Sequence, residues 1–298
     1  MRRLIGIIVV GAIVIILIFI GLAQYHSMGF GRLKSVETLI SEGKLEEAKS
    51  RLDEIAIKQK NPSLAIGKAY ISLAKAFEEK NEYLQARDIY NLIFNNYQNL
   101  NDISGVQDAI GRLNVKLLFS PTVTERDILY KVEPGDTLSK IANKFGTTVD
   151  LIKLSNKLKD DTIHPGDRLK VSKARYKVLI DKSQNILTVL FDDNTIFKVY
   201  RVSTGENNCT PQGTFKIINK IKDPVWYTEG AIVPAESPKN ILGSRWLGLS
   251  IKGYGIHGTI EPETVGKQAT KGCIRMLNSD VEELFTILPI GTEVTIVE

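Results

Sequence analysis

The spacing of apolar and polar positions divides the chain into four stretches. The first, Leu4–Ala23, is an uncharged run of 20 residues rich in Ile, Leu and Val, long enough to cross a bilayer as a helix. Arg2 and Arg3 precede it, and no Lys or Arg follows as far as Phe30. Because Lys and Arg favour the cytoplasmic side, the sequence predicts a single-pass anchor over residues 1–26. This places the N-terminus in the cytoplasm and all later residues on the extracytoplasmic side.

A cleaved export signal is the alternative for the same run. Gly21-Leu22-Ala23 resembles the small-x-small pattern of a cleavage site. The apolar run exceeds the ~7–15 residues usual for the apolar region of a signal peptide, so an uncleaved anchor that holds the protein in the membrane is favoured. Both alternatives export the rest of the protein.

Residues 32–118 carry apolar positions at helical spacing and predict an all-α segment. The pattern repeats with an offset of 38 residues, for example in Leu39/Phe77 and Ala48/Ala86. The run AYISLAKAFEEKNEYLQARDIYNLIF resembles a tetratricopeptide unit, whose usual period is ~34. The segment is therefore expected either to bind a protein partner or to act as a helical spacer.

The pattern changes between residues 128 and 172. Ile128–Val132 predicts a strand, and Thr137 can cap a helix after the turn that precedes it. Thr147 or Thr148 can cap a second helix, and Leu169–Val171 predicts a closing strand. The predicted order is βααβ within about 45 residues.

The residues YKVEPGDTLSKIANKFGTTVDLIKLSNKL and IHPGDRLKV are similar to a LysM domain. The resemblance implies binding of N-acetylglucosamine polymers such as the glycan of peptidoglycan. The family's binding surface would correspond here to Gly135, Asp136, Thr137 and Ile163. The alternative is that this small module is only a spacer.

Residues 176–298 form the last stretch, and it is mainly β. Short β-rich runs alternate with polar turns, as in Ile186–Phe191 and Ile196–Val202. Helix is confined to a short run over Val281–Leu288, and Val294–Val297 predicts a final strand. Gly and Pro punctuate the middle of the stretch, which is typical of a sheet with many connections.

Candidate chemistry gathers near the end of this stretch. Cys273 follows His257 by sixteen residues, and the other two histidines of the chain, His26 and His164, lie far earlier. A free thiol titrates near pH ~8.5, and a neighbouring imidazole can lower that value and hold the thiolate as an ion pair. Gly272 allows backbone N–H groups to approach a reacting carbonyl. A buried structural thiol and histidine are the alternative.

Composition and other motifs exclude several classes. The net charge of +5 favours anionic surroundings, but no basic, aromatic-interleaved patch predicts nucleic acid. No phosphate-binding loop or Cys/His cluster is present, so no cofactor and no metal are expected. Gly253, Gly255 and Gly258 spell G-x-G-x-x-G, yet Pro262 follows at once and too few residues remain for a dinucleotide fold.

Four further runs extend the pattern around the candidate pair. They are STG followed by TPQGTF (203–215), NILGSRWL (240–247), YGIHGT (254–259) and TKGCIRM (270–276). These runs resemble the L,D-transpeptidase catalytic domain (YkuD-type), whose fold is a β-sandwich. The expected fold is therefore multidomain: transmembrane helix (1–26), helical-repeat segment (32–118), βααβ LysM module (128–172) and mainly-β L,D-transpeptidase sandwich (176–298).

This resemblance implies a reaction and the residues that perform it. Cys273 would attack a peptidoglycan tetrapeptide stem, release D-Ala and pass the acyl group from its thioester to an amine of another stem, giving a 3→3 crosslink. His257 would handle the proton, the Gly258 carbonyl would orient its ring, and the N–H groups of Gly272 and Cys273 would form the oxyanion hole. The expected location is the bacterial cell envelope.

Substrate contacts are expected from Arg275, Lys271, Thr270 and Tyr254. Arg275 could grip a substrate carboxylate or form a structural ion pair. Lys271 replaces the histidine found in many members of the family, which predicts either activity with a changed pH profile or a crippled enzyme. Cys209, before Thr210, is either incidental or able to form a disulfide with Cys273.

Two other functions fit the same sequence. Water could resolve the acyl-enzyme, which would make the protein an L,D-carboxypeptidase. Alternatively, the last domain could be inert and the chain a peptidoglycan-binding scaffold. The choice between transferase and hydrolase depends on the shape of the cleft, which the sequence leaves open.

Overall fold

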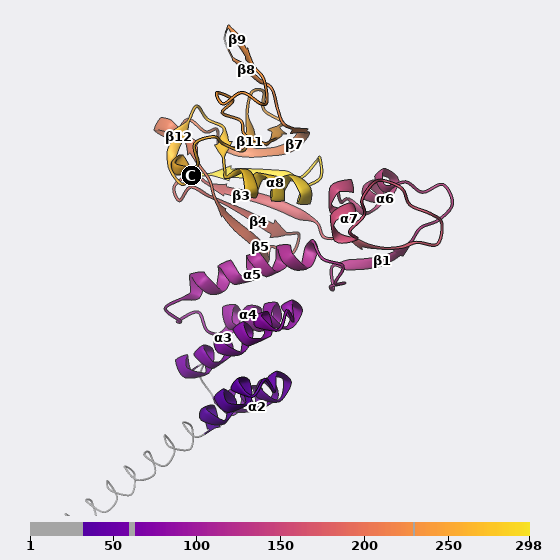
Figure 1. The fold of residues 1–298 in the computed structure, drawn as a ribbon. Helices are drawn as coiled ribbons and strands as arrows, with labels where there is room; N and C mark the ends of the chain where they lie inside the picture. Colours follow the sequence, from indigo (N-terminus) through magenta and orange to yellow (C-terminus); the bar gives the residue numbers. More distant parts are fainter. Residues whose placement is uncertain (1–31, 60–62, 229) are drawn as a thin grey trace, which may run out of the picture. The chain divides into compact units, whose positions relative to one another are not determined.

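The computed structural model describes residues 32–59, 63–228 and 230–298 (Figure 1). The chain divides into two compact units, the first ending at Ala109 and the second spanning Ile110–Glu298. Each unit has its own fold and is described by itself.

The predicted fold class and localisation need correction, because both included a membrane-spanning helix. Across the described residues, no helix is both long and apolar enough to cross a bilayer. The longest helices there, α3 (Leu64–Glu79) and α5 (Ile103–Leu118), have 16 residues each, short of the ~20 that a span requires. The predicted anchor over residues 1–26 lies outside the described residues. The prediction of a single-pass membrane protein is therefore wrong as made.

The first unit consists of helices, as the apolar spacing predicts. Residues 32–41 are helical and are followed by α2 (Leu45–Ile57), α3 and α4 (Tyr83–Asn96). Gly43 and Asn81, which lie 38 residues apart, both adopt positive φ at the turns that separate neighbouring helices. The repeated sequence pattern therefore corresponds to a repeated helix–turn–helix geometry.

Helix α5 begins in the first unit and ends in the second. From Ile110 onward it packs against strand β5 (Ile196–Arg201). The buried side-chain amide of Asn114 donates to the Phe197 carbonyl at 2.8 Å, and Val115 and Leu118 join the core of the main sheet. The second half of this helix is thus a layer of the C-terminal unit, which the sequence pattern did not predict.

The predicted βααβ module is present. Strands β1 (Asp127–Lys131) and β2 (Arg168–Ser172) pair antiparallel around helices α6 (Leu138–Phe145) and α7 (Val149–Ser155). Thr137 and Thr148 cap the two helices, since their hydroxyls accept from the N–H of Lys140 and Leu151. The caps stand where the sequence placed them.

The last part of the chain is built on one mixed sheet of eight strands. Its strand order is β13-β11-β10-β7-β14-β3-β4-β5, with the pairs β11–β13 and β14–β3 parallel. The strands are β3 (Tyr176–Asp181), β4 (Ile186–Phe191), β5, β7 (Gly213–Lys222), β10 (Arg245–Leu249), β11 (Gly255–His257), β13 (Ile274–Arg275) and β14 (Glu293–Val297). Two small ribbons accompany it, β6 (Thr204–Gly205) with β12 (Gln268–Thr270), and β8 (Trp226–Thr228) with β9 (Ala231–Val233).

Strand β7 joins two parts of this sheet. Its first residues, Gly213–Lys216, pair with β14, and Ile217–Lys222 pair with β10. Helix α8 (Asn278–Ile287) buries Val281, Leu284 and Phe285 in the core that the two parts share. The site strands β11 and β13 lie at one end of the sheet, where β13 is the last strand, and their residues Ile256 and Ile274 pack into this core.

The βααβ module is joined to helix α5 by buried polar contacts. Lys170 of β2 is 2 % exposed and donates to the carbonyls of Leu117 and Ser120 at 2.7 and 2.9 Å, at the end of α5. Its ammonium also lies 3.4 Å from the buried carboxylate of Asp127. A lysine near the C-terminus of a helix can satisfy its last carbonyls, so α5 and the βααβ module are held together.

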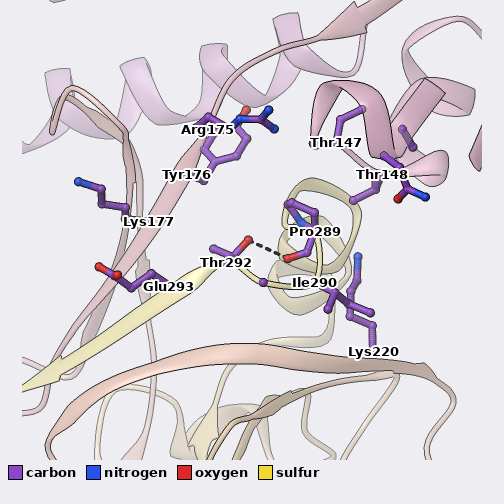
Figure 2. A pocket seen from close by; sticks show the side chains of 14 residues that line it. Thr147, Thr148, Arg175, Tyr176, Lys177, Lys220, Pro289, Ile290, Thr292 and Glu293 are labelled. Atoms are coloured by element: carbon purple, nitrogen blue, oxygen red, sulfur yellow. Dashed lines mark hydrogen bonds between the residues drawn. The ribbon is translucent and has the colours of Figure 1, made fainter. Parts of the chain in front are cut away.

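A pocket of about 660 Å³ lies where the module meets the sheet (Figure 2). In this view Thr147 and Thr148 lie on the right, Arg175 and Tyr176 at the top, and Pro289, Ile290 and Thr292 in the centre, above Lys220. Neither Cys273 nor His257 lines it, so it is separate from the site described next.

Candidate active site

Two parallel strands bring the predicted nucleophile and base into neighbouring positions. In the register of β11 and β13, Ile256 pairs with Ile274 and His257 with Arg275. Cys273 directly precedes β13, and its sulfur lies 3.6 Å from the Gly253 carbonyl oxygen. The fifteen residues between His257 and Cys273 therefore form a connection that returns the chain beside the strand it left.

The His257 ring is buried, with 3 % of the residue exposed. Its Nδ1 lies 2.7 Å from the Gly258 carbonyl oxygen. Because a carbonyl can only accept, Nδ1 carries the proton and Nε2 is left as the basic nitrogen. Burial, followed by the positive charge of Arg275 among the lowering causes, lowers the pKa of His257 to about 4. At neutral pH the ring is thus an uncharged base.

The Cys273 thiol is also uncharged in this arrangement. Burial raises its pKa above the ordinary value, although a backbone hydrogen bond from Gly255 and the charge of Arg275 act in the opposite direction. A thiol of raised pKa and an imidazole of lowered pKa are both uncharged at neutral pH, so the two groups do not form an ion pair at rest. From the sequence, a thiolate held beside a protonated imidazole was expected. The burial of both groups instead favours a neutral thiol whose proton would be removed by His257 during the reaction.

Two threonine hydroxyls fix the loop that carries Cys273. The Thr270 hydroxyl accepts from the Gly272 N–H at 3.1 Å and donates to the Cys273 carbonyl at 2.7 Å. The buried Thr210 hydroxyl accepts from the Gly205 N–H at 2.7 Å and donates to the Gly272 carbonyl at 2.9 Å. Sequence reasoning assigned Thr210 no role, although it stands in the TPQGTF run.

Gly272 is required by its backbone conformation and by its neighbour. Its φ is +119°, and a Cβ there would lie 2.7 Å from the ring of Tyr254. The predicted oxyanion donor at Gly272 points to the Thr270 hydroxyl in this structure. That N–H becomes available to a substrate only when the hydroxyl moves aside.

The other predicted substrate contacts have different surroundings. Lys271 is exposed, whereas Thr270 is buried beneath the loop. The Arg275 side chain is 7 % exposed and pairs with Glu261 at 2.8 Å, with a further bond to the Thr264 hydroxyl. Arg275 thus forms a structural ion pair, which was the alternative to its binding a substrate carboxylate.

The predicted glycan-binding residues lie in and near the turns of the LysM module. Asp136 accepts from the Glu133 N–H and the Tyr130 hydroxyl, contacts that lower the pKa of its carboxyl group. Gly135 has φ +87° and open space around its Cα, while Ile163 packs against the module's core. Asp136 and Thr137 hold the loop, and Gly135 leaves its surface accessible.

The two cysteines are both free thiols, and Cys209 is exposed. A Cβ on Gly205 would meet the Cys209 sulfur and the Gly272 Cα, each within about 3 Å. Cys209 therefore lies beside the loop that carries Cys273, the predicted nucleophile.

Family models match both C-terminal modules. The L,D-transpeptidase catalytic domain matches residues 175–296, and the LysM domain matches residues 130–172. These matches do not extend to the helical segment and leave its tetratricopeptide resemblance unsupported. They agree with the motifs in both modules and with the order of the modules along the chain.

Curated relatives give the same assignment. The putative L,D-transpeptidase YqjB of Bacillus subtilis is 41% identical over 127 residues, covering 41% of this chain and 70% of that protein. The putative L,D-transpeptidase YkuD of Bacillus licheniformis is 33% identical over 177 residues, covering 57% of this chain and 98% of that protein. The chain belongs to the L,D-transpeptidase family.

Solved structures with the same description are more distant. An L,D-transpeptidase from Mycobacterium tuberculosis H37Rv aligns with a TM-score of 0.36 at 17% identity, over 44% of this chain and 62% of that one. The catalytic domain of the Enterococcus faecium L,D-transpeptidase aligns with a TM-score of 0.35 at 22% identity, over 41% of this chain and 96% of that one.

Proposed function

We propose that the protein is a cysteine-dependent peptidoglycan L,D-transpeptidase. The observation that supports this most directly is the β11–β13 register, which sets the nucleophile's loop beside the strand of a buried, uncharged histidine. Family membership supplies the class of reaction, and the geometry supports the residue roles.

In the proposed first step, His257 Nε2 takes the thiol proton while the Cys273 sulfur attacks the carbonyl of the L-configured centre of a tetrapeptide stem. The S–C bond forms, the bond to D-Ala breaks, and the imidazolium returns its proton to the departing amine. The Gly258 carbonyl accepts a hydrogen bond from Nδ1–H throughout the step. The Cys273 N–H is the proposed oxyanion donor, joined by that of Gly272 once Thr270 releases it.

In the second step, an amine of a neighbouring stem attacks the thioester, and His257 takes its proton. The thiol is restored and a 3→3 crosslink is formed. For Arg275 to bind a substrate carboxylate, Glu261 would have to leave the guanidinium, so we assign Arg275 the structural ion pair and leave carboxylate binding to exposed Lys271.

The LysM module is proposed to hold the enzyme on wall glycan through the surface around Gly135. Cell wall-binding protein YocH of Bacillus subtilis matches part of the chain at 48% identity over 56 residues, which is 20% of that protein. Such binding would keep the catalytic part near its substrate in the cell envelope. A partner for the helical segment has no comparable support.

The decisive experiment measures D-Ala release and the mass of a carbapenem adduct. We expect wild type and Cys209→Ser to release D-Ala and to gain one adduct on Cys273, and Cys273→Ala to do neither. Equal release by wild type and Cys273→Ala would contradict a cysteine mechanism. An inert wild type that still binds peptidoglycan would indicate the scaffold function.

Product masses separate transfer from hydrolysis. With a tetrapeptide muropeptide as donor and acceptor, crosslinked dimers indicate a transpeptidase, and tripeptide alone indicates the carboxypeptidase. We expect dimers, because family membership favours transfer. Tripeptide as the sole product would replace the proposed activity with the hydrolytic one.

A further inference from the structure

Trp246 occupies the strand position opposite the proposed base. In the antiparallel pair β10–β11, Trp246 is the direct partner of His257, so the two side chains leave the same face of the sheet. Their rings are nearly parallel, with an interplanar angle of 16° and centroids 6.0 Å apart. The indole therefore stands beside the imidazole and follows its plane.

Two glycines allow the indole to lie close to the sheet. A Cβ on Gly255 would lie 2.5 Å from the benzene edge of Trp246, and one on Gly248 would lie 2.8 Å from its Nε1. Gly248 and Gly255 are themselves cross-strand partners. The absence of side chains at this pair leaves the space that the indole fills.

Gly255 also connects the indole to the nucleophile. Ile256 pairs with Ile274 in the β11–β13 register, so Gly255 lies next to Cys273 across the two strands, while a Cβ on Gly255 would lie 2.5 Å from the ring of Trp246. The indole thus covers β11 at Gly255, two residues before His257 and next to the position of Cys273. A large apolar ring in this place excludes water from both groups.

The charged groups around His257 do not favour a protonated ring. From β13, Arg275 presents a positive charge, and its partner Glu261 is bound to the guanidinium. Cys273 is an uncharged thiol. Arg245 of β10 points to the opposite face of the sheet from Trp246, because side chains alternate along a strand. Its guanidinium lies there 5.6 Å from the centre of the Phe285 ring of α8.

We propose that Trp246 is the positioning residue of the histidine: its indole holds the imidazole in the plane set by the Gly258 carbonyl and shields it from water. The effect of Trp246 on the acylation rate rests on the proposed function, whereas its effect on the pKa of His257 does not. It predicts that His257 stays an unprotonated base in mildly acidic surroundings because Trp246 covers it. A smaller side chain would let the ring tilt and hydrate.

The first test is a histidine titration by NMR on the protein without substrate. We expect the His257 midpoint near pH 4 in wild type, little change in Trp246→Phe, and a rise toward the ordinary value of ~6.5 in Trp246→Leu. Trp226→Leu, at the other tryptophan of the chain, is the matched control and should keep the wild-type midpoint. An unshifted midpoint in Trp246→Leu would overturn the inference even if the enzyme proves inactive.

The second test is the rate of carbapenem acylation at pH 5.5 and 7.5. A midpoint near 6.5 would leave about a tenth of the rings neutral at pH 5.5. Trp246→Leu should therefore lose about tenfold more rate at pH 5.5 than at pH 7.5, and Trp246→Phe should restore most of it. An equal loss at both values would mean that Trp246 only supports the fold. An inactive wild type with the expected NMR shift would contradict the proposed function and leave the positioning role standing.

Discussion

The Thr210 hydroxyl donates a hydrogen bond to the carbonyl of Gly272 across 62 residues of sequence, at 2.9 Å. The same oxygen accepts from the Gly205 N–H, so one buried hydroxyl connects β6 to the residue before Cys273, the proposed nucleophile. The loop of Cys273 is therefore fixed from outside as well as by its own Thr270.

Replacing Thr210 by Val should both destabilise the protein and misplace the proposed nucleophile, Cys273. The change leaves two buried backbone groups without partners, which costs about 2–4 kcal/mol in total. We expect a lower free energy of unfolding in urea and at least a tenfold slower acylation by a carbapenem. Thr210→Ser keeps the hydroxyl and should recover most of both quantities. Wild-type acylation by Thr210→Val would show that the contact does not position Cys273.

Gly272→Ala should impair acylation more than it impairs folding. The φ of +119° and the Tyr254 ring 2.7 Å from the added Cβ force the loop to move, and backbone strain of this kind costs about 1–3 kcal/mol. Acylation should fall by tenfold or more. Gly291→Ala is the matched control, since Gly291 has φ +93° with open space around it. That variant should lose stability and keep its acylation rate, and similar rates in the two variants would argue against a role for the Tyr254 contact.

His257 should make the protein less stable in acid. Above pH ~6.5 the ring is neutral in both the folded and the unfolded chain, so it contributes no pH dependence. Between pH ~6.5 and about 4, the unfolded chain binds a proton that the folded chain does not. The free energy of unfolding should therefore fall by up to about 3 kcal/mol across this window.

Urea titrations at several pH values would measure this dependence. The control is His257→Gln, which lacks the titrating ring, so the difference between the two proteins isolates its contribution. A difference that stays constant from pH 7 to pH 4 would mean that the ring is accessible to protons in the folded state.

Lys170→Ala should loosen the LysM module from the rest of its unit. The change leaves the Asp127 carboxylate and several carbonyls at the end of α5 without the buried ammonium, a loss of about 3–5 kcal/mol for a broken buried pair. We expect lower stability and faster amide exchange at the end of α5. Lys173→Ala, at a neighbouring exposed position, should behave as wild type. Unchanged exchange in Lys170→Ala would show that other contacts hold the junction.

Local patterns predicted most of the elements because those elements depend on near neighbours. The caps at Thr137 and Thr148 act within three residues, so the sequence could place them. The strands around Ile186–Phe191 and the helix α8 follow from alternation and helical spacing. The predicted membrane helix is contradicted as part of the fold. A run of apolar residues shows only that a segment could cross a bilayer, and no helix of the described residues is long and apolar enough to do so.

Contacts between distant residues could not be read in this way. Helix α5 contributes Val115 and Leu118 to the core of the sheet, although its sequence looks like a continuation of the helical segment. Arg275 could have served a substrate or a structural ion pair, and only the fold shows Glu261 at its guanidinium. The surroundings of α5 and of Arg275 both depend on which distant segment packs against them in the folded protein.

The sequence by itself predicted the two C-terminal modules and their order, and it singled out one histidine and one cysteine as a candidate pair, since these follow from local motifs and from the scarcity of histidine. Only the tertiary structure decided that both groups are uncharged at rest. The reason is physical: a pKa responds to burial and to nearby charges, and Trp246, Gly255 and Arg275 reach the site only when β10, β11 and β13 assemble.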